Sequence, residues 1–371
     1  MRFPEFHGEW EEHGLSEYLD FKNGLNPDSK RFGKGIKFIS VMDILNNPVI
    51  TYDCIRASVQ ATDAEMSSFS VENGDILFQR SSETLEDVGR ANVYIDDKVA
   101  VFGGFVIRGK KKANYNPLFF RYLLSSPYAR KRIIPMGAGA QHFNIGQEGL
   151  SKVLLNFPSI EEQTKIASLL HLLDERIATQ SKLIEKLESL IKGLRVSLMQ
   201  IENGNIVHLD EIARIYQPQT ISSTELTEEG FLVYGANGII GKYKQYNHKT
   251  EQICITCRGN TCGMVNYTKP MSWITGNAMV INTDEHQNKV CKRYLYHYLS
   301  AYNFNSIISG SGQPQIVRTP LEQLKVPLPT FLEQKQKATF LDKIQGKIEI
   351  NNKTLNLYLQ QKQYLLRQMF I

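Results

Sequence analysis

The chain of 371 residues has room for two or three domains and is too long for one small core. Its 42% hydrophobic and 22% charged residues exclude a disordered protein, and the absence of long apolar runs and of a signal-peptide pattern indicates a cytoplasmic protein. The net charge of +5 does not by itself indicate a nucleic-acid binder, because the largest local excess is only 7 basic against 3 acidic residues, over residues 330–371.

The first predicted element is a globular unit over residues 1–157. Short β-rich runs such as 36–40 and 75–78 alternate with loops rich in Gly, Asn and Asp, which is typical of a mixed α and β domain. A long helix over residues 158–203 follows. Its start is marked by a capping box, Ser159 with Glu162, and its end by Asn203-Gly204.

A second globular unit, residues 204–329, is followed by a second helix over residues 330–371, in which Thr330 and Glu333 form the capping box. Residues 158–177 and 329–348 align without a gap at an offset of 171, with six of twenty positions identical. The chain is therefore a tandem duplication in which each globular unit precedes a long helix.

Both helices carry apolar residues at alternating steps of four and three, which is the seam of a coiled coil. The seam positions of the first helix are Ile166, Leu170, Leu173, Ile177, Gln180, Ile184, Leu187, Ile191, Leu194 and Leu198. Those of the second are Lys337, Leu341, Ile344, Ile348, Asn351, Leu355, Tyr358, Lys362, Leu365 and Met369. The alternative is two unrelated amphipathic helices, each packed on its own core.

We predict a mixed α/β fold of two globular domains joined by two long helices that pack as an antiparallel coiled coil. Antiparallel packing turns the direct repeat into a pseudo-two-fold arrangement. Facing seam residues then have numbers that sum to about 530, from the helix lengths and the coiled-coil geometry. This register pairs Gln180 with Asn351 near the middle of the rod, where a hydrogen bond between them would fix it.

No motif in the chain supports catalysis, a metal or a cofactor. The Gly-rich segment 137–141 lacks the strand–loop–helix context of a nucleotide-binding loop. In residues 116–119, Asn-Pro-Leu-Phe, a leucine replaces the second proline of the adenine-binding motif of amino-methyltransferases. Cys254 and Cys257 have no second pair at zinc-ligand spacing. We therefore expect no catalytic residues, no metal ligands and no cofactor.

The remaining candidates are cations and amides that could contact DNA. Arginine reads guanine and asparagine reads adenine in the major groove, whereas lysine more often binds phosphate. The candidates are Arg80, Arg90, Lys110, Lys111, Lys112, Asn237, Arg258 and Asn260, within a wider set that includes 130–132, Lys242, Lys244 and Arg293. We expect Arg80 and Arg258 to occupy matching places after matching strands, followed by turns at Gly89-Arg90 and Gly259-Asn260. For any single residue, the alternative is an ordinary solvated surface charge.

Taken together, these features resemble the specificity subunit of Type I restriction-modification systems. The resemblance rests on Pro158 to Gln163 and Pro329 to Gln334, on the Gly-Gln loops that precede them, and on the segment 234–241, and it covers nearly the whole chain.

The resemblance implies two target recognition domains, each reading one half of a bipartite sequence in double-stranded DNA, with the helices as a spacer. It also implies that two modification subunits, which carry the methyltransferase, and restriction subunits, which translocate and cleave DNA, are the partners, and that this chain catalyses nothing. The alternatives are a stand-alone DNA methyltransferase or nuclease with an unfamiliar site, and a coiled-coil scaffold that does not recognise DNA.

Overall fold

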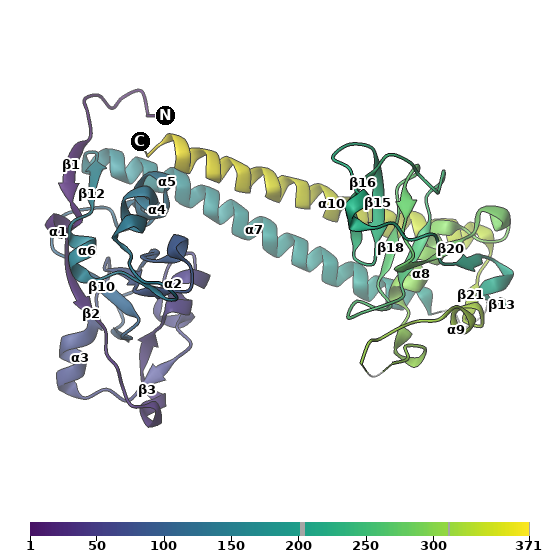
Figure 1. Cartoon of the computed structure of the whole chain (residues 1–371), viewed down its shortest axis with the longest axis horizontal. Coiled ribbons are helices and arrows are strands. Elements are labelled where there is room, and N and C mark those ends of the chain that lie inside the picture. The colour runs from purple at the N-terminus through teal and green to yellow at the C-terminus, as the bar shows by residue number, and fades with distance from the viewer. Residues whose placement is uncertain (201–204, 311, 371) are drawn as a thin grey trace. The chain divides into compact units, whose positions relative to one another are not determined.

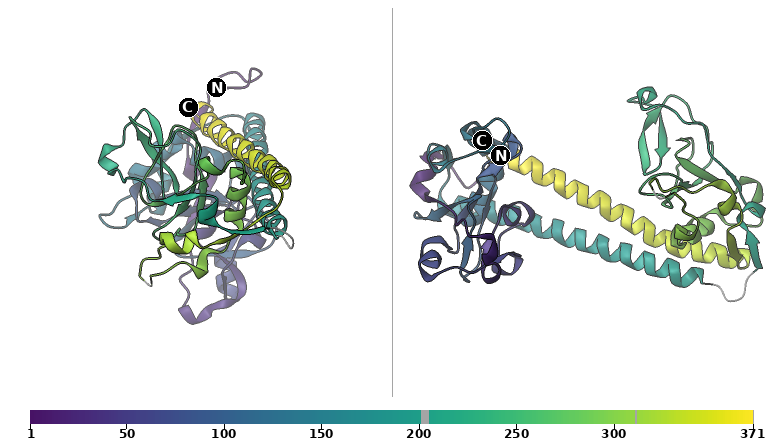
Figure 2. Two further views of the ribbon diagram at one scale, coloured as in Figure 1. Left: turned by 90° about the vertical axis from the view of Figure 1, so that its right-hand side faces the viewer. Right: turned by 60° about the horizontal axis from the view of Figure 1, so that its bottom comes forward.

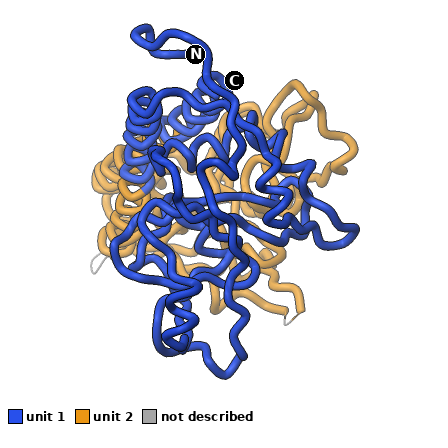
Figure 3. The backbone as a smooth tube through the Cα atoms, turned by 90° about the vertical axis from the view of Figure 1, so that its left-hand side faces the viewer, with its two compact units in different colours: residues 1–181, 354–371 blue, residues 182–353 orange. Residues whose placement is uncertain are grey.

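The computed structural model describes residues 1–200, 205–310 and 312–370. They form two compact units, one of residues 1–181 and 354–371 and one of residues 182–353 (Figure 3). Each unit combines a globular α/β body with part of the two long helices, α7 (Ile160–Met199) and α10 (Phe331–Gln368), as Figure 1 shows. The predicted fold class is confirmed. The predicted helix stop at Asn203-Gly204 lies outside the described residues.

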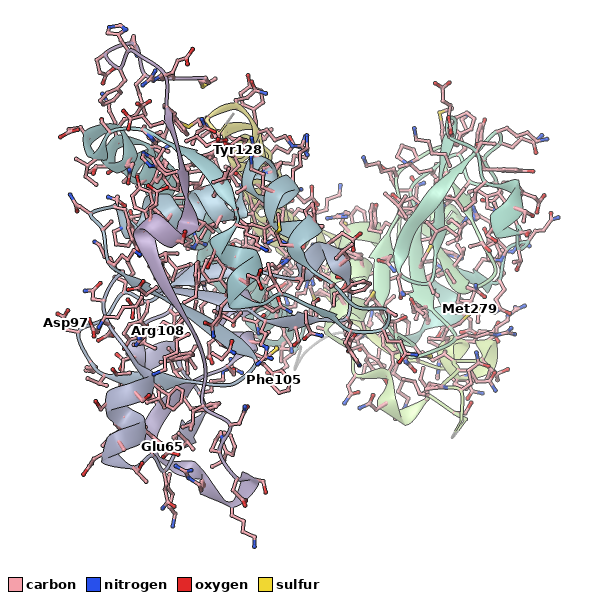
Figure 4. All side chains as sticks on the ribbon, turned by 60° about the vertical axis from the view of Figure 1, so that its left-hand side comes forward. Glu65, Asp97, Phe105, Arg108, Tyr128 and Met279 are labelled. Carbon is pink, nitrogen blue, oxygen red and sulfur yellow. The ribbon has the colours of Figure 1, made fainter. Side chains whose placement is uncertain are left out.

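The first unit is built on a four-stranded antiparallel sheet with strand order β2-β10-β6-β8. Its strands are β2 (Leu19–Asn23), β10 (Val106–Lys111), β6 (Ile76–Gln79) and β8 (Ala91–Val93). A second sheet contains β4 (Ser58–Val59), β3 (Phe32–Ile39), β9 (Ala100–Phe102) and β5 (Ser70–Val71). Two strand pairs complete the unit: β1 (Glu11–Gly14) with β12 (Leu154–Phe157), and β7 (Ser81–Ser82) with β11 (Phe143–Asn144). The positions of Arg108 on β10 and Glu65 near the second sheet can be followed in Figure 4.

Short helices pack against the two sheets of the first unit, and one of them joins the main sheet to the long helices. They are α1 (Leu15–Tyr18), α2 (Val41–Asn46), α3 (Asp63–Phe69), α4 (Pro117–Ser125), α5 (Pro127–Ile133) and α6 (Gln147–Ser151). Asn116 caps α4 and Ser126 caps α5, and each cap is followed by a proline, whose ring favours the first helical turn. The apolar face of α4 packs into one core with the start of α7 and the end of α10.

The second unit repeats this plan. Its main sheet has strand order β14-β20-β17-β18, formed by β14 (Arg214–Tyr216), β20 (Ala278–Asn282), β17 (Ile253–Thr256) and β18 (Val265–Tyr267). The other strands are β13 (Asn205–His208) paired with β21 (Lys325–Leu328), and β16 (Gly238–Tyr243), β15 (Phe231–Gly235) and β19 (Trp273–Ile274). Helices α8 (Lys292–Ala301) and α9 (Arg318–Glu322) take the places of α4 and α6. The same strand order in both units confirms the duplication.

The two long helices pack side by side along the predicted seam (Figures 1 and 2). Every seam position of both helices is buried or half-buried. In the first unit Lys362 of α10 binds Asp174 of α7 at 2.5 Å, and in the second Lys337 of α10 donates to the Leu198 carbonyl of α7 at 2.7 Å. The late part of each helix therefore meets the early part of the other, so the helices run antiparallel.

The glutamine in the first turn of each long helix explains why the similar segments 158–163 and 329–334 occur at both helix starts. Gln163 is 3% exposed; it accepts from the Asn116 backbone N–H at 3.1 Å and donates to the Pro158 carbonyl at 3.0 Å. Gln334 is 1% exposed; it accepts from the Cys291 N–H at 2.8 Å and donates to the Pro329 carbonyl at 3.0 Å. Each glutamine thus joins the first turn of a long helix to the start of the short helix beside it, an arrangement we call the glutamine clamp.

The capping boxes differ between the two helices. Glu333 accepts from the backbone N–H of Thr330 at 2.9 Å, as predicted. Glu162 does not close the other box, because its carboxylate, 1% exposed, forms two hydrogen bonds of 2.7 Å with the Arg2 guanidinium. The other bond of this box does form, from the Glu162 backbone N–H to the Ser159 hydroxyl oxygen at 3.3 Å. The capping-box prediction for this helix is thus confirmed for Ser159 and wrong for the Glu162 side chain, since an ion pair with a residue 160 positions away outcompetes the local bond.

We expect Gln334→Ala to lower the free energy of unfolding by about 2 kcal/mol, because it leaves the Cys291 N–H and the Pro329 carbonyl without their buried partner. Chemical denaturation of the purified chain measures this change. Gln360→Ala, at an exposed position of the same helix, is the control and should change the free energy by less than about 0.5 kcal/mol. Equal effects of the two variants would contradict the clamp.

The pairing of Gln180 with Asn351 stays a prediction, because the two residues belong to different units. On either side of them, Leu173 shares a hydrophobic cluster with Tyr358, and Leu187 shares another with Ile344, as the register requires. We expect a double-mutant cycle with Gln180→Leu and Asn351→Leu to give a coupling of about 1 kcal/mol, since either single change would remove the hydrogen bond predicted between the two side chains. Additive effects, as expected for a control cycle of Gln180 with Gln360, would contradict the pairing.

Candidate nucleic-acid interface

The candidate residues of the first unit lie at two opposite ends of its main sheet. Arg80 follows β6; its backbone N–H donates to the Phe105 carbonyl at 2.9 Å and its guanidinium to the Gly104 carbonyl at 3.3 Å. Arg90 lies beside it, because its carbonyl accepts from the Gln79 N–H at 2.7 Å. The Arg90 guanidinium, 55% exposed, also binds Asp87 at 2.5 Å. Arg80 and Arg90 thus lie at the same end of the main sheet, but their guanidinium groups have different partners, the Gly104 carbonyl and Asp87.

The three lysines of the first unit lie at the far end of β10, since Gly109 pairs with Ile76 while Val106 pairs with Gln79. Lys110 binds Glu72 at 2.7 Å and Lys112 binds Asp20 at 3.3 Å. The Lys111 ammonium donates to the Tyr115 carbonyl at 3.1 Å. Carboxylates therefore offset the charge of Lys110 and Lys112, and the structure does not bring these lysines to Arg80 and Arg90.

In the second unit the three candidates come together. Asn237 lies in the turn between β15 and β16, and its side-chain oxygen accepts from the Thr261 hydroxyl. Arg258 lies on the same segment as Thr261 and pairs with Gln315 in an antiparallel bridge. Asn260 lies between Arg258 and Thr261 in sequence, and Arg258, Asn260 and Asn237 are all exposed. This cluster offers one guanidinium and two amides at one surface, which are groups that can read base edges.

The expected match between Arg80 and Arg258 is wrong by one residue. The Arg80 carbonyl accepts from the Ile145 N–H at 2.9 Å, and the equivalent bond in the second unit joins Ile316 to Cys257 at 3.0 Å. Arg258 therefore corresponds to Ser81. The glycine turns also differ from expectation, since Gly89 and Gly263 donate to equivalent carbonyls, those of Gln79 and Thr256.

The physical reason for this error is strand alternation. A shift of one residue moves a side chain to the other face of an extended segment. Accordingly Arg80 is half-buried against the Gly104 carbonyl, whereas Arg258 is exposed. The five-residue segment 258–262 of the second unit replaces the eight-residue segment 81–88 of the first, so the arginines cannot be aligned by sequence alone.

Sequence reasoning missed two polar residues that the structure adds to these surfaces. Asn144 faces Ser81 in the β7–β11 pair, and Gln315 faces Arg258 in the equivalent bridge. Both are exposed, and they directly precede Ile145 and Ile316, the buried isoleucines whose N–H groups bind the carbonyls of Arg80 and Cys257. The constant offset of 171 between Asn144 and Gln315 is a signal that could have identified them.

Cys254 and Cys257, the two cysteines considered as zinc ligands, are buried in the interior of the second unit. Cys254 is 1% exposed on β17, and burial raises the pKa of its thiol well above the usual range. Cys257 accepts from the Gln217 amide at 3.1 Å. Within residues 1–200, 205–310 and 312–370 no group of three or more His, Cys, Asp or Glu side chains is placed to hold a metal ion. In the same segments no helix is both long and apolar enough to cross a bilayer.

Comparison with known proteins shows one family over most of the chain. A model of the Type I restriction modification DNA specificity domain matches residues 7–189 and again residues 202–359. The specificity subunit of the type I restriction enzyme EcoprrI of Escherichia coli is 32% identical over 140 residues. These residues are 36% of this chain and 34% of that protein. The MjaVIII specificity subunit of Methanocaldococcus jannaschii is 22% identical over 95% of this chain and 91% of that protein.

A similar structure has been solved. The S subunit of a Type I restriction-modification system from M. genitalium has a TM-score of 0.67 at 17% identity, covering 100% of this chain and 99% of that one. At this identity the likeness shows the fold. The chain spans about a third of the length of the E. coli relative and most of the length of the M. jannaschii relative.

Proposed function

Because the chain belongs to the family of Type I restriction-modification DNA specificity domains, we propose that it is the DNA-recognising specificity subunit of such a complex. In this proposal residues 1–157 and 204–329 are the two target recognition domains, and residues 158–203 and 330–371 form the spacer. Each domain reads one half of a bipartite sequence in double-stranded DNA. The chain itself performs no chemistry and needs no cofactor.

The paired segments that follow β6 and β17 in the two units support this proposal most directly. Both units hold solvent-accessible polar side chains on the same hydrogen-bonded frame, but the side chains differ: Ser81 and Asn144 in one, Arg258 and Gln315 in the other. A shared frame with different polar groups is what two readers of different sequences require. A scaffold without DNA recognition would not need it.

The long helices offer a surface for the modification subunits. Leu357 and Tyr364 of α10 lie seven residues apart and are 63% and 54% exposed. Leu183 and Leu190 of α7 have the same spacing and are 42% and 50% exposed. Apolar residues at heptad spacing on the outer side of a helix pair indicate a protein partner. We propose that two modification subunits bind here and that restriction subunits join through them, in the cytoplasm.

The decisive experiment is to express the chain with its modification partner in a host and to sequence the methylated positions of the host DNA. A gapped, two-part motif methylated at adenine is expected. Methyl transfer by the purified chain alone would favour a stand-alone enzyme. Binding that does not depend on DNA sequence, with both units intact, would favour a scaffold.

We expect Arg80→Ala and Arg258→Ala each to relax specificity at one half-site by about 1–3 kcal/mol, because each would remove a bidentate contact to a base. Binding of the complex to duplexes that differ by one base pair measures this effect. The exposed position of Arg258 suits it to a direct contact, whereas Arg80 must first leave the Gly104 carbonyl. An equal weakening on every sequence would instead identify phosphate contacts.

A further inference from the structure

A cleft of about 430 Å³ in the first unit is lined by three arginines, Arg90, Arg121 and Arg130. They come from three different places in the chain: the position directly before β8, helix α4 and helix α5. The other polar residues of the wall are Asn47, Asn92, Ser125, Gln363 and one acidic residue, Glu86. Guanidinium groups that converge on one cleft from separate elements are typical of an anion-binding site.

Arg130 is the centre of this cluster. One of its terminal nitrogens, Nη2, donates to the backbone carbonyls of Glu86 and Val88, at 2.9 and 2.6 Å. The other, Nη1, is buried and has no hydrogen-bond partner in the described part of the chain. Burial, and then the neighbouring charge of Arg90, lower the pKa of Arg130 to about 10. The Arg130 guanidinium thus has one N–H group without an acceptor and a positive charge that its surroundings disfavour. A bound anion would supply the acceptor and stabilise the charge.

The local carboxylates do not balance Arg130. Asp87 binds Arg90 at 2.5 Å. Asp174 is shared between Arg121, at 3.2 Å, and Lys362, at 2.5 Å. The described residues include no carboxylate within 4.0 Å of Arg130, since no ion pair of this side chain is found among them. Glu86 also lines the cleft, but its hydrogen bond with Arg130 is through the backbone carbonyl, so Arg130 is the cleft arginine that forms no ion pair among the described residues.

The second unit does not repeat this cleft. Arg90 corresponds to Met264, because the Arg90 carbonyl accepts from the Gln79 N–H and the Met264 carbonyl accepts from the equivalent N–H, that of Thr256. Arg121 corresponds to Tyr296, because Asn116 and Cys291 occupy equivalent places in the two glutamine clamps. Arg90 and Arg121 are thus not needed for the fold that both units share, and a function of the first unit alone is the better explanation for these two side chains.

We propose that the cleft formed by Arg90, Arg121 and Arg130 binds a phosphate group. The two sources of that group are a phosphodiester of bound DNA and a free phosphate or nucleotide. If the source is DNA, which rests on the proposed function, the contact positions the first unit on the backbone without reading sequence.

The test uses the full chain and its complex with the modification partner. The variants are Arg121→Gln and the double variant Arg90→Gln/Arg121→Gln, which leave the buried Arg130 in place. Lys152→Gln is the matched control, because it removes one positive charge from an exposed position of the first unit outside the cleft. Circular dichroism confirms that each variant is folded.

In the first arm, inorganic phosphate is added at constant ionic strength against chloride, and thermal unfolding is followed. The phosphate should stabilise the original chain and Lys152→Gln, and this stabilisation should disappear in the double variant. In the second arm, binding of the complex to duplex DNA is measured between about 50 and 200 mM salt. The salt slope should fall by about one for each DNA phosphate that the variant no longer binds, equally on target and unrelated sequences.

Changes in both arms establish a DNA phosphodiester as the ligand, and a change in the phosphate arm alone establishes a free phosphate group. No change in either arm, or the same changes in Lys152→Gln, would overturn the proposal. The phosphate arm does not depend on DNA recognition, so it still decides the inference if the chain proves not to be a specificity subunit. Conversely, the methylated motif can be intact while both arms show nothing.

Discussion

Exchange of residues 1–157 for the corresponding unit of another family member will change one half of the methylated sequence and leave the other half unchanged. The reason is that each unit has its own main sheet and its own exposed polar residues. The spacer between the half-sites should also stay the same, because both long helices are retained. The effect is complete replacement of one half-site, which is the largest change that we expect from any variant.

Sequencing of methylated adenines in a host that carries the chimera and the modification partner measures the outcome. The reciprocal exchange of residues 204–329 is the control, and it should alter only the other half-site. A chimera that changes both halves, or that changes the spacer length, would show that the units do not read DNA independently.

Lowering the pH below about 6.5 will destabilise the second unit more than the first, because this unit buries two histidines whose ordinary pKa lies there. His297 is 0% exposed; its Nδ1 accepts from Arg195 at 3.1 Å, so the proton on Nε2 points to Asp342 at 2.8 Å and the ring is neutral. Burial lowers the pKa of His297, although Asp342 opposes this effect. His248 is 6% exposed, and burial lowers its pKa also.

Proton linkage gives the direction of this change in stability with pH. Below the ordinary histidine pKa of about 6.5 the unfolded chain binds protons that the folded unit does not, so stability falls by up to about 1.4 kcal/mol per pH unit for each histidine. Asp342 acts in a lower range. Burial raises its pKa, but hydrogen bonds from His297 and Arg293 outweigh burial and lower it overall, so its contribution is complete above about pH 4 and is lost only as the pH falls below that value.

In the first unit the pKa of His13 is shifted in the opposite direction, because its hydrogen bond to Glu17 raises it. Amide hydrogen exchange at about pH 7 and about pH 5.5, on either side of the ordinary histidine pKa, distinguishes the units, with faster opening expected in α8 than in α4 at the lower pH. His297→Gln is the control variant and should flatten the pH dependence of α8 whatever its own stability. Equal acid sensitivity of both units would contradict this account.

Local and periodic features were predictable from the sequence. The seam of α7 and α10 follows from residue spacing, and all its positions are covered as expected. The capping box of Thr330 and Glu333 needs only four residues, and it forms. These features depend on interactions within a few turns of one helix or on a regular repeat.

Features that depend on distant partners were not predictable. The carboxylate of Glu162 turns to Arg2, and nothing near either residue indicates that they meet. The register between Arg80 and Arg258 is set by bonds from Ile145 and Ile316, on segments about 60 residues further along the chain. The arginine cleft joins side chains of three elements and is invisible to any local pattern.

The glutamine clamp has a consequence for how such proteins diversify. Gln163 and Gln334 bind backbone N–H groups, at Asn116 and Cys291, so they place no demand on the side chain there. Their other partners, the carbonyls of Pro158 and Pro329, belong to the helix side of the junction. If recombination brings in an unrelated globular unit, the glutamine can still bind it, because any residue with a backbone N–H can occupy the position of Asn116 or Cys291. Recombination can therefore exchange a globular unit while the long helix that follows it is kept.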